Sequence, residues 1–203
     1  MSGQRLGVFG GTFDPIHLGH LFVASAVMAE ARLERILFLP VGDPAHRRAH
    51  ASASDRKAMV RLAIDGNQDF VLDETALRQA GPVYTADTMP LLKAAFPDAE
   101  FSFIAGADSL VDTPWRRLNE VAAGLQRFYV VAREGMPKER LAPTLATLPA
   151  ELAQRFILLN LPLIDVSSTV IRERVAAKKT IRYLVPDAVE KYIAAKGLYE
   201  ERD

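Results

Sequence analysis

The sequence predicts an α/β fold of the Rossmann-like type, a doubly wound and mostly parallel sheet with helices on both faces. Apolar runs of strand length recur along the chain, and most are continuous rather than alternating, which is typical of strands buried on both faces. Segments with helical character lie between these runs. A strand followed by a helix, repeated about six times, is the pattern of a doubly wound sheet.

The expected elements alternate along the chain. The predicted strands cover residues 6–10, 35–39, 70–73, 101–105, 128–132 and 156–161, and the predicted helices cover residues 18–32, 54–66, 85–96, 138–147, 169–178 and 187–196. In the first helix the apolar residues Leu21, Ala24, Met28 and Ala31 fall at helical spacing. Residues 41–54 are small and polar, which predicts a surface loop, and the proline-rich residues 133–149 predict a loop with a short helix.

Length and composition predict one globular domain. The chain has 203 residues, 49% of them apolar, which is enough for a packed core. We therefore expect a single domain over residues 1–203, with a C-terminal helical part from about residue 168 packed on it. Basic and acidic residues balance at 25 each, which argues against nucleic acid as a partner but still allows a small anionic ligand.

The chain contains no cysteine, which excludes disulfides, thiolate zinc sites and cysteine nucleophiles. The absence of cysteine fits a reducing compartment. The first residues carry no secretory signal, and no apolar run reaches the ~20 residues of a membrane span. These features predict a cytoplasmic protein without a membrane partner, and they carry no signal for an oligomeric state.

The first motif follows the first predicted strand and reads Gly10-Gly11-Thr12-Phe13-Asp14-Pro15-Ile16-His17-Leu18-Gly19-His20. In doubly wound folds ligands bind outside the carboxyl ends of the strands, and adjacent glycines let the backbone approach a ligand closely. His17 and His20 are three residues apart, so both lie on one face of a helix, at the N-terminus that attracts anions. This spacing predicts a phosphate site. The candidate residues are Gly10, Gly11, Thr12, Phe13, His17 and His20.

Other interpretations of the histidines remain open at this point. A pair at this spacing is more often solvated or part of a core than catalytic. All four histidines, His17, His20, His46 and His50, lie in the first quarter of the chain, and their spacing could be that of a zinc site. Because no further motif supports zinc, no protein-bound metal is predicted.

The second motif follows the last predicted strand and contains Ser167, Ser168, Thr169 and Arg172. Serine and threonine are frequent N-cap residues. If Ser168 caps the helix, Arg172 lies one turn further on the same side, and hydroxyls, amide groups and a guanidinium converge on a second anion site. The alternative is an ordinary capped helix with an exposed arginine.

Both motifs resemble those of one enzyme superfamily. His17-Leu18-Gly19-His20 resembles the H-x-G-H signature of the nucleotidyltransferases, and Ser167–Arg172 resembles their I-S-S-T-x-x-R triphosphate motif, with Val166 in place of isoleucine. The same motifs occur in pantetheine-phosphate adenylyltransferases, so they do not specify the acceptor.

The remaining segments resemble nicotinate-nucleotide adenylyltransferase over nearly the whole chain. They are Pro44-Ala45-His46-Arg47, similar to a P-P-H-K or P-P-H-R loop; Asp55-Arg56-Lys57-Ala58-Met59; Tyr84-Thr85-Ala86-Asp87-Thr88, similar to Y-T-x-D-T; Gly106-Ala107-Asp108-Ser109-Leu110 with Trp115; and Arg182-Tyr183-Leu184-Val185-Pro186. Two positions depart from the family pattern, because Ala45 replaces a proline and Val83 stands where serine is common.

The resemblance implies transfer of AMP from ATP to nicotinate mononucleotide, with magnesium accompanying ATP. It implies that His17 and His20 contact the α- and β-phosphates, that Ser167, Ser168, Thr169 and Arg172 face the β- and γ-phosphates, and that Gly106 and Asp108 bind the adenosine. It also implies a mononucleotide site with Tyr84, Thr85 and Trp115 at the pyridine and His46 and Arg47 at the phosphate. Alternatives are nicotinamide mononucleotide or phosphopantetheine as the acceptor, or a nucleotide sensor without turnover. The joint presence of His17, His20 and Arg172 argues against a sensor.

Overall fold

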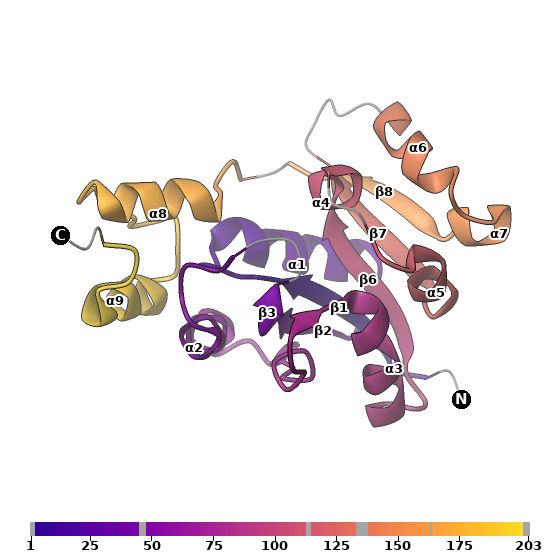
Figure 1. Ribbon diagram of the computed structural model, residues 1–203, viewed down its shortest axis with the longest axis horizontal. Helices are drawn as coiled ribbons and strands as arrows, with labels where there is room; N and C mark the ends of the chain where they lie inside the picture. Colours follow the sequence, from indigo (N-terminus) through magenta and orange to yellow (C-terminus); the bar gives the residue numbers. More distant parts are fainter. Residues whose placement is uncertain (1–2, 45–47, 113–114, 133–137, 163, 201–203) are drawn as a thin grey trace.

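A computed structural model describes residues 3–44, 48–112, 115–132, 138–162 and 164–200. Within these residues the central sheet has six parallel strands in the order β4-β2-β1-β6-β7-β8 (Figure 1). The strands are β1 (Arg5–Gly11), β2 (Arg35–Pro40), β4 (Phe70–Leu72), β6 (Glu100–Gly106), β7 (Arg127–Ala132) and β8 (Phe156–Asn160). The predicted fold class and all six predicted strands are confirmed.

The strand order places a ligand site at the centre of the sheet. From β1 the chain adds β2 and β4 on one side, and it then returns to add β6, β7 and β8 on the other. Val8 in β1 accordingly pairs with Leu37 on one side and Phe103 on the other. Between β1 and β6 the connections leave in opposite directions, and in such sheets the crevice at the carboxyl ends of these two strands binds the ligand.

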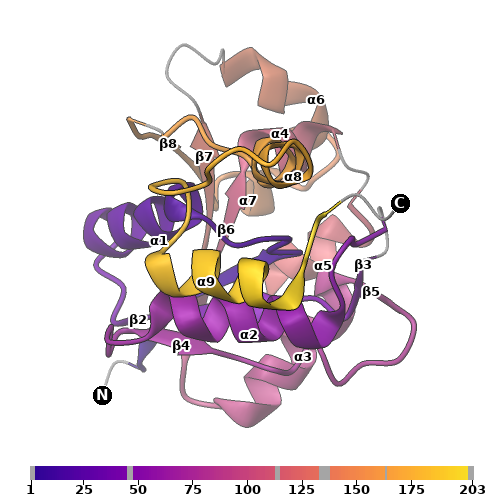
Figure 2. The same cartoon turned by 90° about the vertical axis from the view of Figure 1, so that its left-hand side faces the viewer.

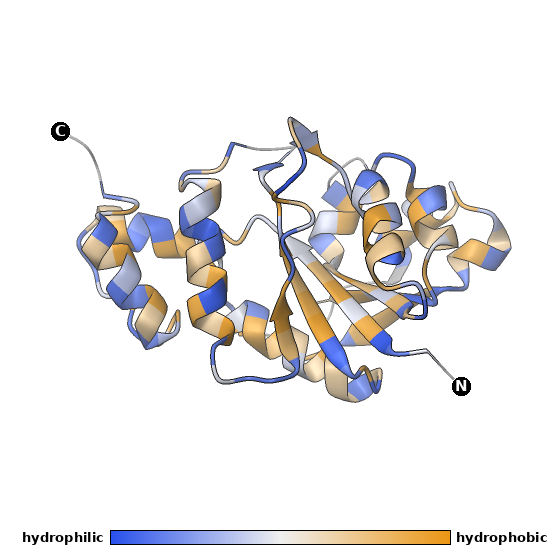
Figure 3. Ribbon diagram, turned by 90° about the horizontal axis from the view of Figure 1, so that it is seen from below, coloured by the Kyte–Doolittle hydropathy of each residue, from blue (hydrophilic) through white to orange (hydrophobic). Residues whose placement is uncertain are grey.

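Alternate strand residues face two hydrophobic cores, one on each side of the sheet. Leu6 and Val8 belong to the core that is covered by α3 (Thr85–Ala95), α4 (Ala107–Asp112) and α5 (Leu118–Ala123). Phe9, between Val8 and the glycines, belongs to the core of α1 (Leu18–Glu30) and α2 (Ala53–Ile64). The strands are accordingly mainly hydrophobic in Figure 3, whereas the helices also carry hydrophilic residues. Burial on both faces explains the continuous apolar runs.

The C-terminal part contributes to the second core through α8 (Ser168–Ala176) and α9 (Asp187–Lys196), which lie together at one end of the molecule (Figure 1). Helix α9 lies along α2 (Figure 2), and the Tyr192 hydroxyl donates a hydrogen bond of 2.9 Å to Asp55. None of the helices in the described ranges is long and apolar enough to cross a membrane.

Several short elements differ from the prediction. The predicted helix 138–147 is divided into a 3-10 turn, η1 (Lys138–Leu141), and α6 (Ala142–Leu145). Helices α4, α5 and α7 (Ala150–Ala153) were not predicted, nor was the parallel pair of β3 (Asp43–Pro44) and β5 (Pro82–Val83), which lies partly in the predicted surface loop. Elements of two to six residues are too short to display a periodicity of their own, and contacts with the rest of the fold determine them.

Candidate active site

The first motif lies at the carboxyl end of β1, where the strand order predicts the ligand. Gly11 ends β1, and a Cβ at this position would lie 2.9 Å from the Phe13 ring, so the turn needs glycine here. Thr12 and Phe13 are buried, and Phe13 has a left-handed backbone with φ of 50°. Because the Phe13 ring packs against Phe9 and His20, any ATP contact from Phe13 would come from its backbone.

His17 and His20 lie side by side at the start of α1. His17 is the N-cap residue, and its ring centroid lies 3.7 Å from that of His20. The His17 backbone N–H donates to Nδ1 of His20 over 3.2 Å, so a neutral His20 carries its proton on Nε2. This assignment follows from the hydrogen-bond network and makes Nε2–H of His20 a donor suited to a phosphate oxygen.

His17 is a buried histidine that stays neutral at physiological pH. Only 7% of the residue is exposed, and burial lowers its pKa from 6.5 to about 4. Its Nδ1 atom makes no hydrogen bond of normal geometry with the residues that the structure describes. A Cβ at Gly19 would lie 3.0 Å from Nδ1 of His17, so Nδ1 faces the first turn of α1. The other ring nitrogen, Nε2, is therefore the one that can form a hydrogen bond with a phosphate.

The burial of His17 predicts a pH dependence of folding stability. Its folded pKa of about 4 lies below the unfolded value of 6.5, so between these pH values only the unfolded chain binds the extra proton. The contribution to stability is complete above pH 6.5 and is lost as the pH falls. Between pH 7 and pH 5 the wild type should lose about 2 kcal/mol more unfolding free energy than His17→Asn. Urea unfolding at both pH values measures this difference, and equal losses in the two proteins would contradict it.

Gly19 explains why the motif has glycine between its histidines. A Cβ at Gly19 would lie 3.0 Å from the His17 ring and 3.1 Å from a Val166 methyl group. Both distances are shorter than ordinary van der Waals contact. Glycine therefore lets α1 approach Val166, the residue that precedes the second motif.

The second motif is tied directly to the first. The cap of α8 is Ser167, which accepts from the Val170 N–H over 3.2 Å, so the prediction that Ser168 caps this helix is wrong. The Ser168 hydroxyl instead donates to the Pro15 carbonyl over 2.8 Å. Ser168 lies one residue inside the helix, and its hydroxyl thereby points back to the turn of the first motif.

Arg172 connects the motifs a second time. Its Nη1 donates to the Asp14 carbonyl over 2.8 Å, and its Nη2 donates to the Thr169 hydroxyl over 3.2 Å. The guanidinium is half-buried, so its plane is held by protein while part of it remains accessible. Direct hydrogen bonds therefore join two segments that are more than 150 residues apart in the sequence.

One part of the helix N-terminus differs from the expectation of free amide groups. The Leu18 N–H donates to the Leu184 carbonyl over 3.0 Å, and the His20 N–H returns to the His17 carbonyl. Leu184 belongs to the R-Y-L-V-P segment, which thus docks on the start of α1. The Leu18 amide is therefore not available to a phosphate, although the positive end of the helix dipole remains.

Asp14 and Arg56 are structural members of the site that were not among the predicted site residues. Arg56 is 1% exposed and donates to the carbonyls of Thr12, Val41 and Gly42 over 2.6–2.8 Å. It thereby fixes the ends of β1 and β2 against each other. Asp14 is 5% exposed, and its carboxylate accepts from the backbone N–H groups of the loop before α2. Asp14 lies within the first motif and Arg56 within the Asp55–Met59 segment, but no local pattern reveals their partners.

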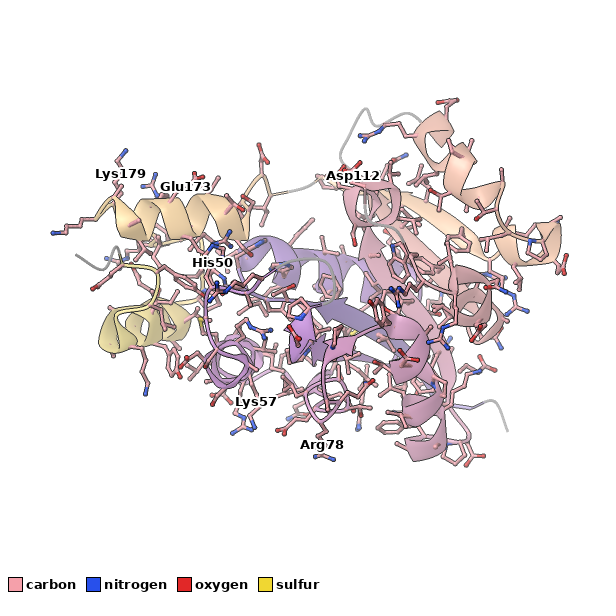
Figure 4. All side chains as sticks on the ribbon, viewed as in Figure 1. His50, Lys57, Arg78, Asp112, Glu173 and Lys179 are labelled. Carbon is pink, nitrogen blue, oxygen red and sulfur yellow. The ribbon has the colours of Figure 1, made fainter. Side chains whose placement is uncertain are left out.

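The predicted adenosine residues lie at the end of the neighbouring strand. Gly106 ends β6 and is exposed, and apart from its chain neighbours no atom of the described residues lies within 4 Å of the position that a Cβ would take. Asp108 lies in the first turn of α4 with 64% of its side chain exposed, and the guanidinium of Arg140 in η1 lies 3.8 Å from its carboxylate. In Figure 4 the labelled Asp112, at the end of α4, marks this side of the site, and His50, near α8, marks the other.

The predicted mononucleotide residues Thr85 and Trp115 belong to two segments that contact each other. Arg116 lies over the Tyr84 ring at 4.5 Å, and Arg117 forms an ion pair with Asp87. These contacts tie the Trp115 segment to the N-terminus of α3. Within the described residues the N-cap residue of this helix, Tyr84, makes no capping hydrogen bond through its side chain, so the first amide groups can meet water or a ligand.

Trp115 is both a core residue and a candidate ligand contact. Its ring meets Phe103 and Phe128 edge-on, with interplanar angles of 89° and 70°, and its Nε1 donates to the Ser109 carbonyl over 3.0 Å. The residue is only half-buried. The indole N–H is used within the protein, so a ligand could meet Trp115 only through its ring.

The predicted phosphate residues His46 and Arg47 lie outside the described residues. Within the described part of the chain, no group of three or more His, Cys, Asp or Glu side chains could hold a metal ion.

Comparison with known proteins identifies relatives of this chain. Residues 8–174 match the cytidylyltransferase-like family. The chain is 46% identical over 199 residues to a probable nicotinate-nucleotide adenylyltransferase of Thermomicrobium roseum, covering 97% of this chain and 92% of that protein. It is 39% identical to the nicotinate-nucleotide adenylyltransferase of Bacillus subtilis, covering 97% of this chain and 99% of the relative.

A solved structure shares the fold at lower identity. The nicotinic acid mononucleotide adenylyltransferase of Plasmodium falciparum, complexed with NaAD, superposes with a TM-score of 0.78 at 18% identity and covers 97% of each chain. At this identity the similarity supports the fold alone.

Proposed function

The chain belongs to the nicotinate-nucleotide adenylyltransferase family, and we propose from its site how it transfers AMP from ATP to nicotinate mononucleotide. The reaction yields deamido-NAD and pyrophosphate. The observation that carries the proposal is that the two motifs meet beyond the carboxyl end of β1, through Arg172 to the Asp14 carbonyl and Ser168 to the Pro15 carbonyl.

The chemistry needs positioning more than proton transfer. A phosphate oxygen of the mononucleotide attacks the α-phosphorus of ATP in line, and the bond to the pyrophosphate oxygen breaks. Because the attacking phosphate is already an anion, no general base is required. Positioning of the two substrates can contribute up to about 7–11 kcal/mol to the rate. The remaining task is to stabilise charge on the transferring group.

The proposed roles on the ATP side follow from the hydrogen bonds. His20 donates from Nε2 to the α-phosphate, since its Nδ1 is occupied by the His17 N–H. Neutral His17 supports the α- and β-phosphates from the same face. Arg172 and Thr169 address the β- and γ-phosphates, and Ser168 holds the turn that joins the motifs. Asp108 accepts from the adenosine ribose, which its exposure allows.

At the nicotinate mononucleotide, which accepts AMP, Trp115 stacks on the pyridine ring. The backbone N–H groups near Thr85 donate to the carboxylate of that ring. The N-terminus of α3 supports this role for Thr85, because in the described part of the chain the N-cap residue Tyr84 provides no side-chain acceptor for the first amide groups. His46 and Arg47 remain proposed contacts of the mononucleotide phosphate, by resemblance alone.

Magnesium is proposed to bind together with ATP. Since no cluster of three metal-binding side chains occurs in the described residues, the donors would be mainly phosphate oxygens and water, which suits magnesium. Bound magnesium would neutralise charge on the phosphates. The protein residues near it, His17, His20 and Arg172, would hold those phosphates in place.

The direct test measures pyrophosphate release from ATP with nicotinate mononucleotide, nicotinamide mononucleotide and phosphopantetheine in parallel. The proposed function requires release with nicotinate mononucleotide. A nucleotide sensor would bind ATP and release no pyrophosphate with any of the three.

Arg172→Lys is expected to lower kcat/KM for ATP by roughly 10- to 100-fold. Lysine keeps the charge, but a single nitrogen cannot replace a guanidinium that bonds the Asp14 carbonyl and Thr169 and still meets phosphate. The range corresponds to one charge-assisted hydrogen bond, about 1.5–3 kcal/mol. Arg174→Lys on the same helix is the control, since Arg174 donates to the Thr180 carbonyl instead. Equal kcat/KM values for Arg172→Lys and Arg174→Lys would contradict the proposal that the several N–H groups of the Arg172 guanidinium hold protein and phosphate together.

A further inference from the structure

Tyr199 lies beyond the last helix, yet its side chain reaches the first motif. Gly197 ends α9 with φ of 56°, and the Leu198 N–H returns to the Ile193 carbonyl over 3.1 Å. Tyr199 itself has a left-handed backbone with φ of 65°. An L-residue keeps such a conformation only where the surrounding contacts stabilise it. This reversal directs the chain back over the protein.

The Tyr199 hydroxyl donates a hydrogen bond of 2.7 Å to Oδ1 of Asp14. Burial of Tyr199, together with the charge of Asp14, raises the pKa of the phenol, so the group stays protonated and continues to donate. The positive charges of Arg172 and Arg56 oppose this rise, and Arg172 donates to the carbonyl of the same Asp14 that accepts from Tyr199. Tyr199 thus belongs to the surroundings of the phosphate site.

Asp14 is the residue on which several elements converge. Its Oδ1 also accepts from the Ala51 N–H over 3.1 Å, and its Oδ2 accepts from the His50 N–H over 2.6 Å. Its backbone carbonyl accepts from Arg172 over 2.8 Å. The carboxylate is therefore engaged by the C-terminal segment and by the loop before α2, while the carbonyl of the same residue orients the arginine.

We propose that Tyr199 is a positioning residue for adenylyl transfer, which holds Asp14 so that its carbonyl keeps Arg172 aligned on the ATP phosphates. This inference rests on the proposed function. Tyr199 acts through Asp14 and does not itself touch substrate. Loss of the hydroxyl leaves Oδ1 with one backbone donor, so Asp14 can shift and Arg172 shifts with it. Small misplacements of positioning groups cost up to ~100-fold in rate.

Tyr192 provides a matched control for the loss of a hydroxyl. Its hydroxyl also donates to an aspartate carboxylate, that of Asp55 in α2, over 2.9 Å. Both tyrosines therefore attach the C-terminal part to the rest of the protein through the same kind of bond. Only the Tyr199 bond ends on a residue that also holds Arg172.

The experiment compares Tyr199→Phe, Tyr192→Phe and the wild type by thermal unfolding and by pyrophosphate release at varied ATP and varied nicotinate mononucleotide. Both variants should lower Tm by about 2–4 °C, the usual effect of one hydrogen bond in a chain of this size. Only Tyr199→Phe should lower kcat/KM for ATP, by ~10-fold. The KM for the mononucleotide should change by less than about twofold, since the contacts on that side are untouched.

Two results would overturn the proposal. If the wild type is active and Tyr199→Phe matches its kinetics, or if both variants lose activity equally, Tyr199 has only a structural role. A wild type that releases no pyrophosphate would instead overturn the proposed function, and this inference with it, so the two failures are distinguishable.

Discussion

His20→Ala is expected to lower kcat for adenylyl transfer by ~10²–10³, the usual cost of removing one donor to a charge that develops in the transition state. The Nδ1 atom of His20 accepts from the His17 N–H at 3.2 Å, so a neutral His20 carries its proton on Nε2, and we expect Nε2–H to donate to the α-phosphate. Because the charge on this group grows in the transition state, kcat should fall more than the affinity for ATP does.

Steady-state kinetics of pyrophosphate release measure this effect. The variant loses the acceptor for the His17 N–H and the ring contact with Phe13 at 5.1 Å, so thermal unfolding should be followed in the same samples. A folded variant with low kcat supports the assignment. A folded variant with the kcat of the wild type would remove His20 from the mechanism.

The second large effect concerns the choice of acceptor. The enzyme is expected to prefer nicotinate over nicotinamide mononucleotide by at least ~10² in kcat/KM. Stacking on Trp115 cannot provide this preference, because both rings present similar faces and the indole N–H is already bonded to the Ser109 carbonyl. Hydrogen bonds must therefore discriminate. A carboxylate only accepts, whereas a carboxamide also donates.

The N-terminus of α3 has the polarity that such discrimination requires. Among the residues that the structure describes, the N-cap residue Tyr84 makes no side-chain cap there, and Arg116 over the Tyr84 ring adds a positive charge beside this helix end. Backbone N–H groups near Thr85 would donate to both carboxylate oxygens of nicotinate mononucleotide. In nicotinamide mononucleotide one of these N–H groups would face the NH₂ group of the carboxamide, which is also a donor. A site built around hydrogen bonds can discriminate by ~10⁴ or more in kcat/KM against an analogue that leaves its polar groups unpaired.

Parallel measurements of kcat/KM for the two acceptors test this prediction, with Trp115 variants as controls. Trp115→Ala should weaken both acceptors about equally and leave their ratio nearly unchanged. Because Trp115 also packs on Phe103 and Phe128, Trp115→Phe is the milder variant, which keeps an aromatic face. Comparable kcat/KM values for the two acceptors in the wild type would contradict the preference for the acid.

The sheet and the two phosphate motifs could be predicted from the sequence for a local reason. Strands buried on both faces need continuous apolar residues, and the runs at Leu6, Ile36 and Phe103 therefore mark their own positions. The glycines, histidines and hydroxyl residues follow strand ends, and parallel strands bring their carboxyl ends to one edge of the sheet. Sequence order thus placed both motifs at the same edge of the sheet, and the family resemblance predicted that they act together.

Only the tertiary structure decided how the parts of that site are held. The bonds from Tyr199 to Asp14 and from Tyr192 to Asp55 join residues 185 and 137 positions apart, and the Leu18 N–H meets the Leu184 carbonyl. Each of these hydrogen bonds depends on how α8 and α9 pack against α1 and α2. The residues adjacent in the sequence contain no pattern that predicts this packing. Local sequence patterns report backbone preference and burial. The hydrogen-bond partner of a buried polar atom is instead a distant group, and the completed fold determines which group comes within hydrogen-bond distance.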